Sequence, residues 1–265
     1  MPEIIYPEPS YQVQGAFFDV YNSLCHLGLS EKGWENALMI ALADRGIAAE
    51  RQVAYELHYK GYRVGLFYVD VIADGKLLIE LKRAETLLPI DQAQVIAYLK
   101  VTALKLGILV NLGGSRLDFK RIPNIAPKPV IDDSWTKPSP TPANLLYPEL
   151  TGTVRALLYT VHRELGVGFT HMHYRRAMQI ALRQSGIKYT VKKEIAIQFR
   201  GQPIETHETR LLIVDDKILL APIAVRQITE LLKGRFRQYL RLFNLRLGLI
   251  ANFHSPSLEI VTVRI

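Results

Sequence analysis

The spacing of apolar side chains along this chain predicts a mixture of helices and strands. Apolar residues recur three or four positions apart in residues 11–27 and 31–45, and a glycine follows each segment, which predicts two amphipathic helices. Apolar runs bounded by turn residues predict three strands between residues 52 and 82. A helix is predicted for residues 89–106 and a short buried strand for 108–111. This order predicts an α/β layer around a mixed sheet.

The second half of the chain repeats the first. Four small residues recur after 140 positions, as Gly28, Ala37, Gly46 and Gly61 and then as Gly168, Ala177, Gly186 and Gly201. Later residues recur after 141 positions, such as Tyr98, Gly107 and Asn111 and then Tyr239, Gly248 and Asn252. We expect the one-residue step to lie in a hairpin turn, where an insertion costs least. Such self-similarity predicts two copies of one fold.

A proline-rich segment separates the two copies. Residues 123–148 hold seven of the 14 prolines, which is typical of a semi-rigid linker. A single domain with a surface loop of this length would be unusual. We therefore predict a first domain over residues 1–122 and a second over residues 149–265. The two domains are expected to pair within one chain as a pseudo-dimer.

Residues 70–82, with the sequence DVIADGKLLIELK, form the predicted hairpin around which the first copy is built. Residues two apart on a strand share a face, so Glu80 and Lys82 point the same way. A turn over residues 74–76 places Asp70 opposite Glu80, with Cβ atoms about 5 Å apart. A two-residue Asp-Gly turn places Asp70 opposite Ile79 instead. The sequence leaves these two registers open.

Charged side chains on adjacent buried strands are costly unless they are paired or bind a cation. The cluster of Asp70, Glu80 and Lys82 therefore indicates either a buried ion-pair network or an active site. Two facing carboxylates suit a shared Mg²⁺ ion, which prefers oxygen ligands. These three residues alone do not distinguish an active site from other structures, since the same residues can also occur at a solvent-exposed strand end.

Composition and charge narrow the class of protein. The chain of 265 residues is 49% hydrophobic and long enough for two domains. Its single cysteine, Cys25, excludes an internal disulfide and favours a reducing cytoplasm. No apolar run approaches the 18 residues of a membrane span, and the first residues lack the pattern of a signal peptide. We expect a cytoplasmic protein without a membrane partner.

The net charge of +8 is concentrated in the second half. Residues 1–145 contain 15 Lys and Arg against 16 Asp and Glu, whereas residues 146–265 contain 18 against 9. No acidic residue occurs between positions 231 and 258. A predicted helix there carries a basic stripe that favours contact with the phosphates of nucleic acid, with an acidic protein surface as the rival partner. Its candidate residues are Lys233, Arg235, Arg237, Arg241 and Arg246.

Several motifs of the first copy together resemble a known family. They are Gly28-x-x-Glu31-x-x-Trp34, ERQV at 50–53, YKG at 59–61, Asp70, Glu80-x-Lys82, and Gln94 with Tyr98. The combination resembles the bacterial GxxExxY proteins, which are assigned to the PD-(D/E)xK nuclease superfamily. The resemblance spans about residues 11–122 and again about 150–265. It implies two tandem restriction-endonuclease-like domains of αβββαβ order with mixed sheets.

The resemblance also implies a function and the residues that perform it. Superfamily members are metal-dependent phosphodiesterases that use Mg²⁺ or Mn²⁺. Carried over by position, Asp70 and Glu80 are the metal ligands, and Lys82 positions the attacking water. Glu31 completes the catalytic site from a helix, and Gln94 is an accessory polar group. A nucleic-acid substrate follows, with DNA favoured over RNA.

The second copy lacks every one of these groups. His171, Arg210, Ala221, Ile223 and Arg235 stand where the first copy has Glu31, Asp70, Glu80, Lys82 and Gln94. A site without carboxylates cannot hold Mg²⁺. The leading hypothesis is therefore a nuclease with one active domain and one inactive, basic domain. The alternatives are a binding or regulatory module with a vestigial site, and a structural pseudo-dimer.

Overall fold

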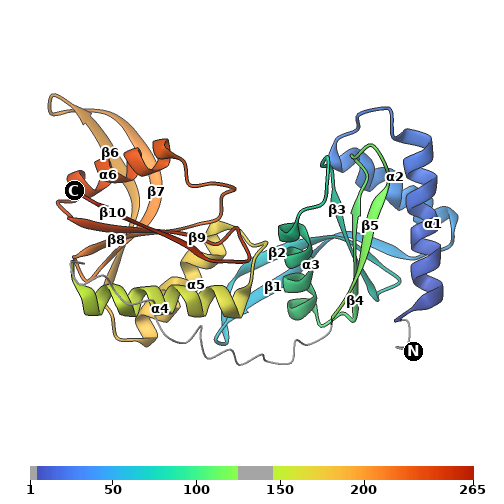
Figure 1. Cartoon of the computed structure of the whole chain (residues 1–265), viewed down its shortest axis with the longest axis horizontal. Coiled ribbons are helices and arrows are strands. Elements are labelled where there is room, and N and C mark those ends of the chain that lie inside the picture. The colour runs from blue at the N-terminus through green and yellow to red at the C-terminus, as the bar shows by residue number, and fades with distance from the viewer. Residues whose placement is uncertain (1–4, 125–145) are drawn as a thin grey trace. The chain divides into compact units, whose positions relative to one another are not determined.

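The computed structural model describes residues 5–124 and 146–265, so most of the proline-rich segment lies outside the described residues. The chain divides into two compact units. The first holds described residues 5–57 and 65–124, and the second holds residues 58–64 and 146–265. The turn of one hairpin of the first copy thus belongs to the second unit. Figure 1 shows the elements of both units.

The two copies have the same order of elements, which confirms the predicted repeat. Those of the first copy are α1 (Pro7–Leu24), α2 (Glu31–Asp44), β1 (Ala49–Tyr59), β2 (Tyr62–Ala73), β3 (Leu77–Lys82), α3 (Pro89–Thr102), β4 (Leu106–Asn111) and β5 (Asp118–Pro123). Those of the second are α4 (Pro148–Leu165), α5 (His171–Gln184), β6 (Tyr189–Phe199), β7 (Gln202–Val214), β8 (Ile218–Ile223), α6 (Glu230–Leu242), β9 (Leu247–Asn252) and β10 (Glu259–Arg264). The predicted αβββαβ core is present, preceded by one helix and followed by one strand.

Each copy contains a five-stranded mixed sheet. The strand orders are β1-β2-β3-β4-β5 and β10-β9-β8-β7-β6. β3 and β4 run parallel, joined by α3, whereas β2 and β5 pair antiparallel with their neighbours β3 and β4. The second sheet shows the same pattern, with β8 and β9 parallel. The single parallel pair is why a helix must cross over at this point in each copy.

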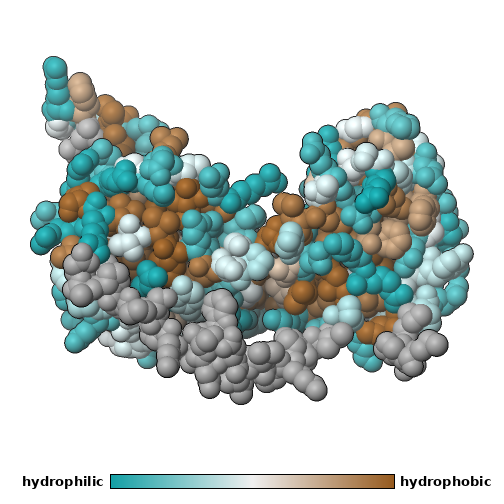
Figure 2. Space-filling model, in the orientation of Figure 1, coloured by the Kyte–Doolittle hydropathy of each residue, from teal (hydrophilic) through white to brown (hydrophobic). Residues whose placement is uncertain are grey.

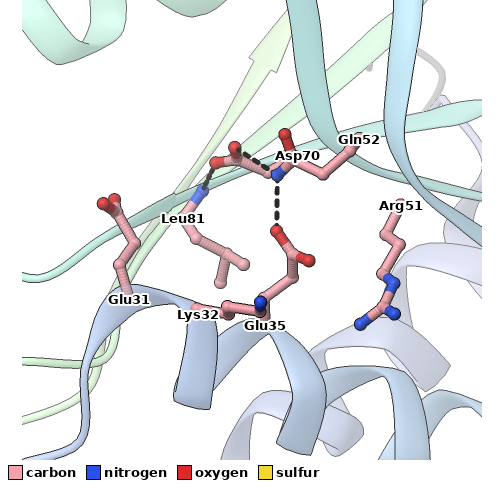
Figure 3. A pocket seen from close by; sticks show the side chains of 7 residues that line it. All are labelled: Glu31, Lys32, Glu35, Arg51, Gln52, Asp70 and Leu81. Carbon is pink, nitrogen blue, oxygen red and sulfur yellow. Dashed lines mark hydrogen bonds between the residues drawn. The ribbon is translucent and has the colours of Figure 1, made fainter.

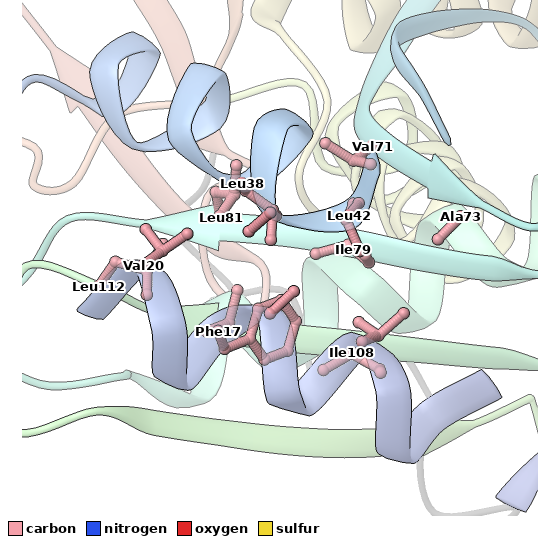
Figure 4. Packing of buried hydrophobic residues seen from close by; sticks show 14 of the residues in the cluster. Phe17, Val20, Leu38, Leu42, Val71, Ala73, Ile79, Leu81, Ile108 and Leu112 are labelled. Atoms are coloured by element: carbon pink, nitrogen blue, oxygen red, sulfur yellow. The ribbon is translucent and has the colours of Figure 1, made fainter. Parts of the chain in front are cut away.

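Helices α1 and α2 cover one face of the first sheet. Phe17 and Leu38 are fully buried there against Ile79 and other inward-facing residues of β2, β3 and β4 (Figure 4). Ser30 caps α2, because its hydroxyl accepts a hydrogen bond of 3.2 Å from the Gly33 N–H. These contacts fix the start of α2 beside the sheet.

Helix α3 packs on the opposite face, and its close approach depends on a glycine. A Cβ at Gly107 would lie 2.5 Å from Cγ1 of Val95, which is closer than side-chain atoms pack. Gly248 occupies the same place under Phe236 of α6. The repeated glycines therefore let a helix lie directly on the parallel strand pair in both units.

An asparagine holds the connection that follows β3 in the first unit and β8 in the second. Asn111 donates a 2.8 Å hydrogen bond to the Ala84 carbonyl and accepts one of 3.1 Å from the Ala84 N–H. Asn252 makes the same pair of bonds with Val225, at 2.8 and 3.0 Å. Each Asn side chain is buried. The hydrogen bonds between Asn111 and Ala84 position the residues immediately after Lys82.

Polar and apolar side chains are both visible on the surface of each unit (Figure 2). The β6–β7 hairpin carries the exposed side chains of Phe199 and Ile204 near its turn. In the described residues, no helix is long and apolar enough to cross a membrane.

Candidate functional site

Asp70 and Glu80 face each other across the β2–β3 hairpin. The strands pair Ala73 with Leu77 and Val71 with Ile79, so three residues form the turn. One step beyond Val71 and Ile79, Asp70 is opposite Glu80. The longer of the two turns considered above is therefore correct. Asp74 and Gly75 have φ values of 52° and 59°, the left-handed conformation that closes this turn.

Asp70 is held in place by the neighbouring strand. Its Oδ2 accepts a 2.9 Å hydrogen bond from the Leu81 N–H, and its Oδ1 lies 3.5 Å from Nε2 of Gln52 (Figure 3). Burial raises the pKa of Asp70; the Leu81 N–H and Lys82 oppose this shift, and Glu31 and Glu35 add to it. The surroundings of Asp70 therefore disfavour the negative charge on its own carboxyl group unless a cation is present.

Glu80 is the most perturbed group of the site. Its side chain is buried, and Oε1 accepts a 2.7 Å hydrogen bond from Nζ of Lys82. Oε2 is buried without a hydrogen-bond partner among the described residues. Burial, followed by repulsion from Asp70, raises the pKa of Glu80 to about 8. A buried carboxylate oxygen with no donor is an unsatisfied acceptor, which a proton or a metal ion would satisfy.

Lys82 links the carboxylate to α3. Besides Glu80, its ammonium donates to Oε1 of Gln94 at 3.1 Å, and Gln94 in turn donates to the Tyr98 hydroxyl at 2.9 Å. Burial alone would lower the pKa of Lys82, but Glu80 and Asp70 together raise it above its ordinary value. The lysine is therefore a fixed cation beside the two carboxylates.

Helix α2 contributes the acidic residues on the other side of Asp70. Glu31 is at the start of α2 and close enough to raise the pKa values of both Asp70 and Glu80. Glu35, one turn later, is buried and accepts a 2.5 Å hydrogen bond from Gln52. A cavity of about 490 Å³ is lined by Glu31, Lys32, Glu35, Arg51, Gln52, Asp70 and Leu81 (Figure 3).

The sequence interpretation missed Glu35 and Gln52. The position of Glu35, four residues after Glu31 on one helix face, was a signal for it. Gln52 has a φ of 51° within β1, an unusual conformation for a residue other than glycine. No sequence pattern indicates this distortion, which accompanies the contact of Gln52 with both Glu35 and Asp70.

The residues present fit a two-carboxylate metal site. Within the described chain, no three His, Cys, Asp or Glu side chains are grouped closely enough to hold a metal ion by themselves. Mg²⁺ commonly takes one or two protein carboxylates and keeps several waters. Asp70 and the unsatisfied Oε2 of Glu80 meet that requirement. Lys82, hydrogen-bonded to the other oxygen, is too basic to be a ligand and remains beside the site.

At the equivalent position in the second unit, the strand β8 carries no acidic residue. Ala221 and Ile223 of β8 replace Glu80 and Lys82, and Ala221 is part of an apolar cluster with Leu211 and Phe236. The predicted place of the extra residue was wrong. Both hairpins have three-residue turns, and the additional residue lies in β7 instead.

The bulge in β7 changes one of the predicted equivalences. Between Lys192 opposite Leu211 and Glu194 opposite Glu208, β7 has one residue more than β6. Arg210, with a φ of 51°, lies in this bulge. By strand register Leu211 is therefore the counterpart of Asp70, and Arg210 is the inserted residue. Neither side chain can replace a carboxylate ligand.

The basic residues predicted for one helix divide into three environments. Arg235, Arg237 and Arg241 are exposed on α6, whose Phe236 and Leu240 face the core as expected. Lys233 forms a 2.8 Å ion pair with Glu230 in the first turn. The placement of Arg246 on this helix was wrong. Asn244, with a φ of 53°, follows the end of α6, and Arg246 is exposed just before β9.

Comparisons with known proteins place these observations in a family. A family model described as the PD-(D/E)XK nuclease superfamily matches residues 7–122 and, separately, residues 148–264. A solved structure described as "Crystal structure of SSO0001" is 23% identical, with a TM-score of 0.29. The alignment covers 44% of this chain and 59% of that chain. No curated protein matches.

The finer resemblance to GxxExxY proteins stays a prediction, since the matching model describes the superfamily. Its two matched segments coincide with the two repeats of the fold, from α1 to β5 and from α4 to β10. Together they span most of the chain. The chain therefore belongs to the PD-(D/E)XK nuclease superfamily, as a tandem repeat of two such domains.

Proposed function

We propose that this protein is a metal-dependent nuclease that hydrolyses phosphodiester bonds, with its active site in the first domain. The observation that carries the proposal is the unsatisfied Oε2 of Glu80, buried directly across the hairpin from Asp70. A structural ion pair would satisfy both oxygens of a buried carboxylate, because leaving one unpaired is costly. A divalent cation bound here would remove that cost.

Asp70 and Glu80 are the proposed ligands of Mg²⁺ or Mn²⁺, together with the carbonyl of Leu81. When bound, such an ion supplies a water of lowered pKa and neutralises charge on the phosphate. Lys82 holds the Glu80 carboxylate in place and offers a fixed positive charge for phosphate oxygens. Gln94 orients Lys82 from α3.

Glu31 and Glu35 contribute from the opposite wall of the cavity. Glu31 is exposed at its rim, where it can accept a proton or hold a water beside Asp70. Glu35 acts indirectly, because it fixes Gln52, whose amide lies against Asp70. The exposed arginines of α6 offer contacts to nucleic-acid phosphates from the second domain, whose strand β8 has no carboxylate to hold a metal ion. DNA is the favoured substrate, and a reducing cytoplasm is the favoured location.

A direct test is incubation of the protein with labelled single- and double-stranded DNA and RNA, each with Mg²⁺, Mn²⁺ or a chelator. Cleavage is expected only with the metal, and Glu80→Gln should abolish it while the fold is retained. Asp44→Asn is a matched control, since Asp44 is an exposed carboxylate at the far end of α2. Equal cleavage by wild type and Glu80→Gln would contradict the proposed role of Glu80.

The second candidate function is a non-catalytic nucleic-acid- or protein-binding module that retains a vestigial site. It is favoured by the lack of a third carboxylate grouped with Asp70 and Glu80 in the described residues. Calorimetric titration with Mg²⁺ and Mn²⁺ separates the two functions. A module with a vestigial site predicts no metal binding that depends on Asp70 and Glu80, together with no cleavage of any substrate.

A further inference from the structure

The start of α5 carries cations where the start of α2 carries acids. His171 is the first residue of α5 as Glu31 is of α2, and Arg175 follows one turn later, at the position of Glu35. The β7 bulge adds Arg210. Burial lowers the pKa values of both His171 and Arg175, and the charge of Arg210 lowers them further. The charge of this position is thus inverted between the two copies.

Arg175 is the central residue of this cluster. It is only 7% exposed, and no hydrogen bond or ion pair joins it to any residue that the structure describes. Burial is the main reason that its pKa is lowered, and the charges of Arg210 and Arg176 add to this effect. A largely buried arginine that has no anionic partner and lies beside two other cations is unfavourable for folding.

The neighbouring groups do not supply the missing anion. Arg210 is 3.6 Å from the exposed carboxylate of Glu208, which leaves most of its donors free. Arg176 donates a 3.0 Å hydrogen bond to the carbonyl of Val64, a neutral acceptor. No acidic side chain is among the charges that shift the pKa of His171 or Arg175. The cluster therefore has an excess of positive charge.

Three features of the cluster suit a phosphate group. The five donors of a guanidinium form a planar fork that matches two phosphate oxygens. The first N–H groups of a helix, here of the 14-residue α5, point toward an anion at its N-terminus. A partly buried site strengthens both interactions relative to bulk water.

We propose that His171, Arg175 and Arg210 form a phosphate-binding site in the second unit, at the position that corresponds to the carboxylate site of the first. This inference deepens the proposed function and rests on it for the identity of one phosphate source, a nucleic acid. The inactive copy has then exchanged a cation site for an anion site. The phosphate belongs either to the backbone of a strand or to a free or terminal phosphate group.

Thermal unfolding in the absence of divalent metal tests phosphate binding without involving cleavage. Inorganic phosphate should raise the Tm of the wild type above its value in chloride of equal ionic strength. Arg175→Met keeps the length of the side chain and should abolish this rise. Without phosphate the variant should be at least as stable as the wild type, because it removes an unpaired buried charge.

Arg183→Met is the matched control, since Arg183 is an exposed cation near the other end of the same helix. It should keep the full response to phosphate. The inference is overturned if phosphate does not stabilise the wild type, or if it stabilises Arg175→Met equally. The Tm of the folded, metal-free Arg175→Met protein is the quantity measured, so the test does not depend on loss of cleavage.

Oligonucleotides with and without a 5′-phosphate distinguish the two sources. If the site holds a terminal phosphate, the phosphorylated strand binds more tightly and Arg175→Met removes the difference. If it holds the backbone, both strands bind alike and both lose roughly 10- to 100-fold in affinity in the variant. Unchanged affinity of both strands in Arg175→Met contradicts the inference. Failure of Glu80→Gln to affect cleavage would contradict only the proposed nuclease site.

Discussion

Glu80 and Gln94 both accept a hydrogen bond from Lys82, but one carboxylate oxygen of Glu80 has no partner in the described structure. The ammonium of Lys82 lies 2.7 Å from Oε1 of Glu80 and 3.1 Å from Oε1 of Gln94, whereas Oε2 of Glu80 has no donor in the described structure. The polar network is thus complete on the α3 side, whereas Oε2 of Glu80 is left out of it. An incomplete network in a buried position is unfavourable by itself and points to a missing ligand.

The first prediction concerns stability in the absence of metal. The pKa of Glu80 is about 8 in the folded protein, against 4.5 for an exposed glutamate. The folded state therefore holds a proton that the unfolded chain has released, and the free energy of unfolding should fall as pH rises from about 4.5 to 8. Burial also raises the pKa of Asp70, which acts in the same direction.

Glu80→Gln should remove most of this dependence, because glutamine does not titrate. The expected difference between wild type and variant across the window is a few kcal/mol. Chemical denaturation at several pH values, with a chelator present, measures it. Parallel pH profiles for the two proteins would show that Glu80 does not titrate in this range.

The second prediction concerns metal binding. Mg²⁺ or Mn²⁺ should displace the proton of Glu80, so affinity should increase with pH up to about 8 and binding should release protons. Calorimetry in buffers of different ionisation enthalpy counts the released protons. Asp70→Asn and Glu80→Gln should each abolish binding, and Asp44→Asn should leave it unchanged. A pH-independent affinity would mean that the metal does not bind at Glu80.

The sequence predicted the fold of both copies well, for a physical reason. Residues such as Gly107 and Gly248 are required wherever a helix lies on the central strands, and so they recur at a constant spacing. The fifth strand of each sheet was not predicted. Helix α3 also ends earlier than expected, at Thr102, because Ala103 adopts a left-handed conformation with a φ of 57°.

The site was predictable only in part. Strand alternation placed Glu80 and Lys82 together, but the register of Asp70 depended on a turn whose length the sequence left open. The extra residue of the second copy was assigned to the hairpin turn because an insertion costs least there. Asp74 and Lys76 already recur after 141 positions, as Asp215 and Lys217, so the extra residue precedes the turn. The φ of 51° at Arg210 is a property of the packed sheet that no local pattern indicates.

The third prediction concerns Gln52, which joins Glu35 to Asp70. Gln52→Ala should lower metal affinity or the rate of cleavage by roughly 10- to 100-fold, as is usual when a residue that orients a metal ligand is lost. Glu35→Gln should have a smaller effect, since an amide oxygen can still accept the hydrogen bond from Gln52. If Gln52 has a purely structural role, Gln52→Ala should lower the stability of the protein and leave its metal affinity unchanged. Stability and metal affinity are therefore both measured.

The last prediction concerns the exposed arginines of α6. Arg237 and Arg241 are one helical turn apart. The carboxylate of Glu230, which is close enough to Arg237 for their charges to interact, is already paired with Lys233. If both contact duplex phosphates, replacing them with Ala should weaken binding to all sequences alike. The slope of log affinity against log salt should then flatten by up to about two.

Lys233→Ala provides an internal comparison on the same helix face. Its ammonium is already paired with Glu230 at 2.8 Å, so its loss should change the salt slope less than the loss of either arginine. Fluorescence anisotropy with a chelator present, at several salt concentrations, measures all variants without cleavage. If the double arginine variant keeps both affinity and slope, α6 is a solvated surface, and the second domain must bind nucleic acid elsewhere or not at all.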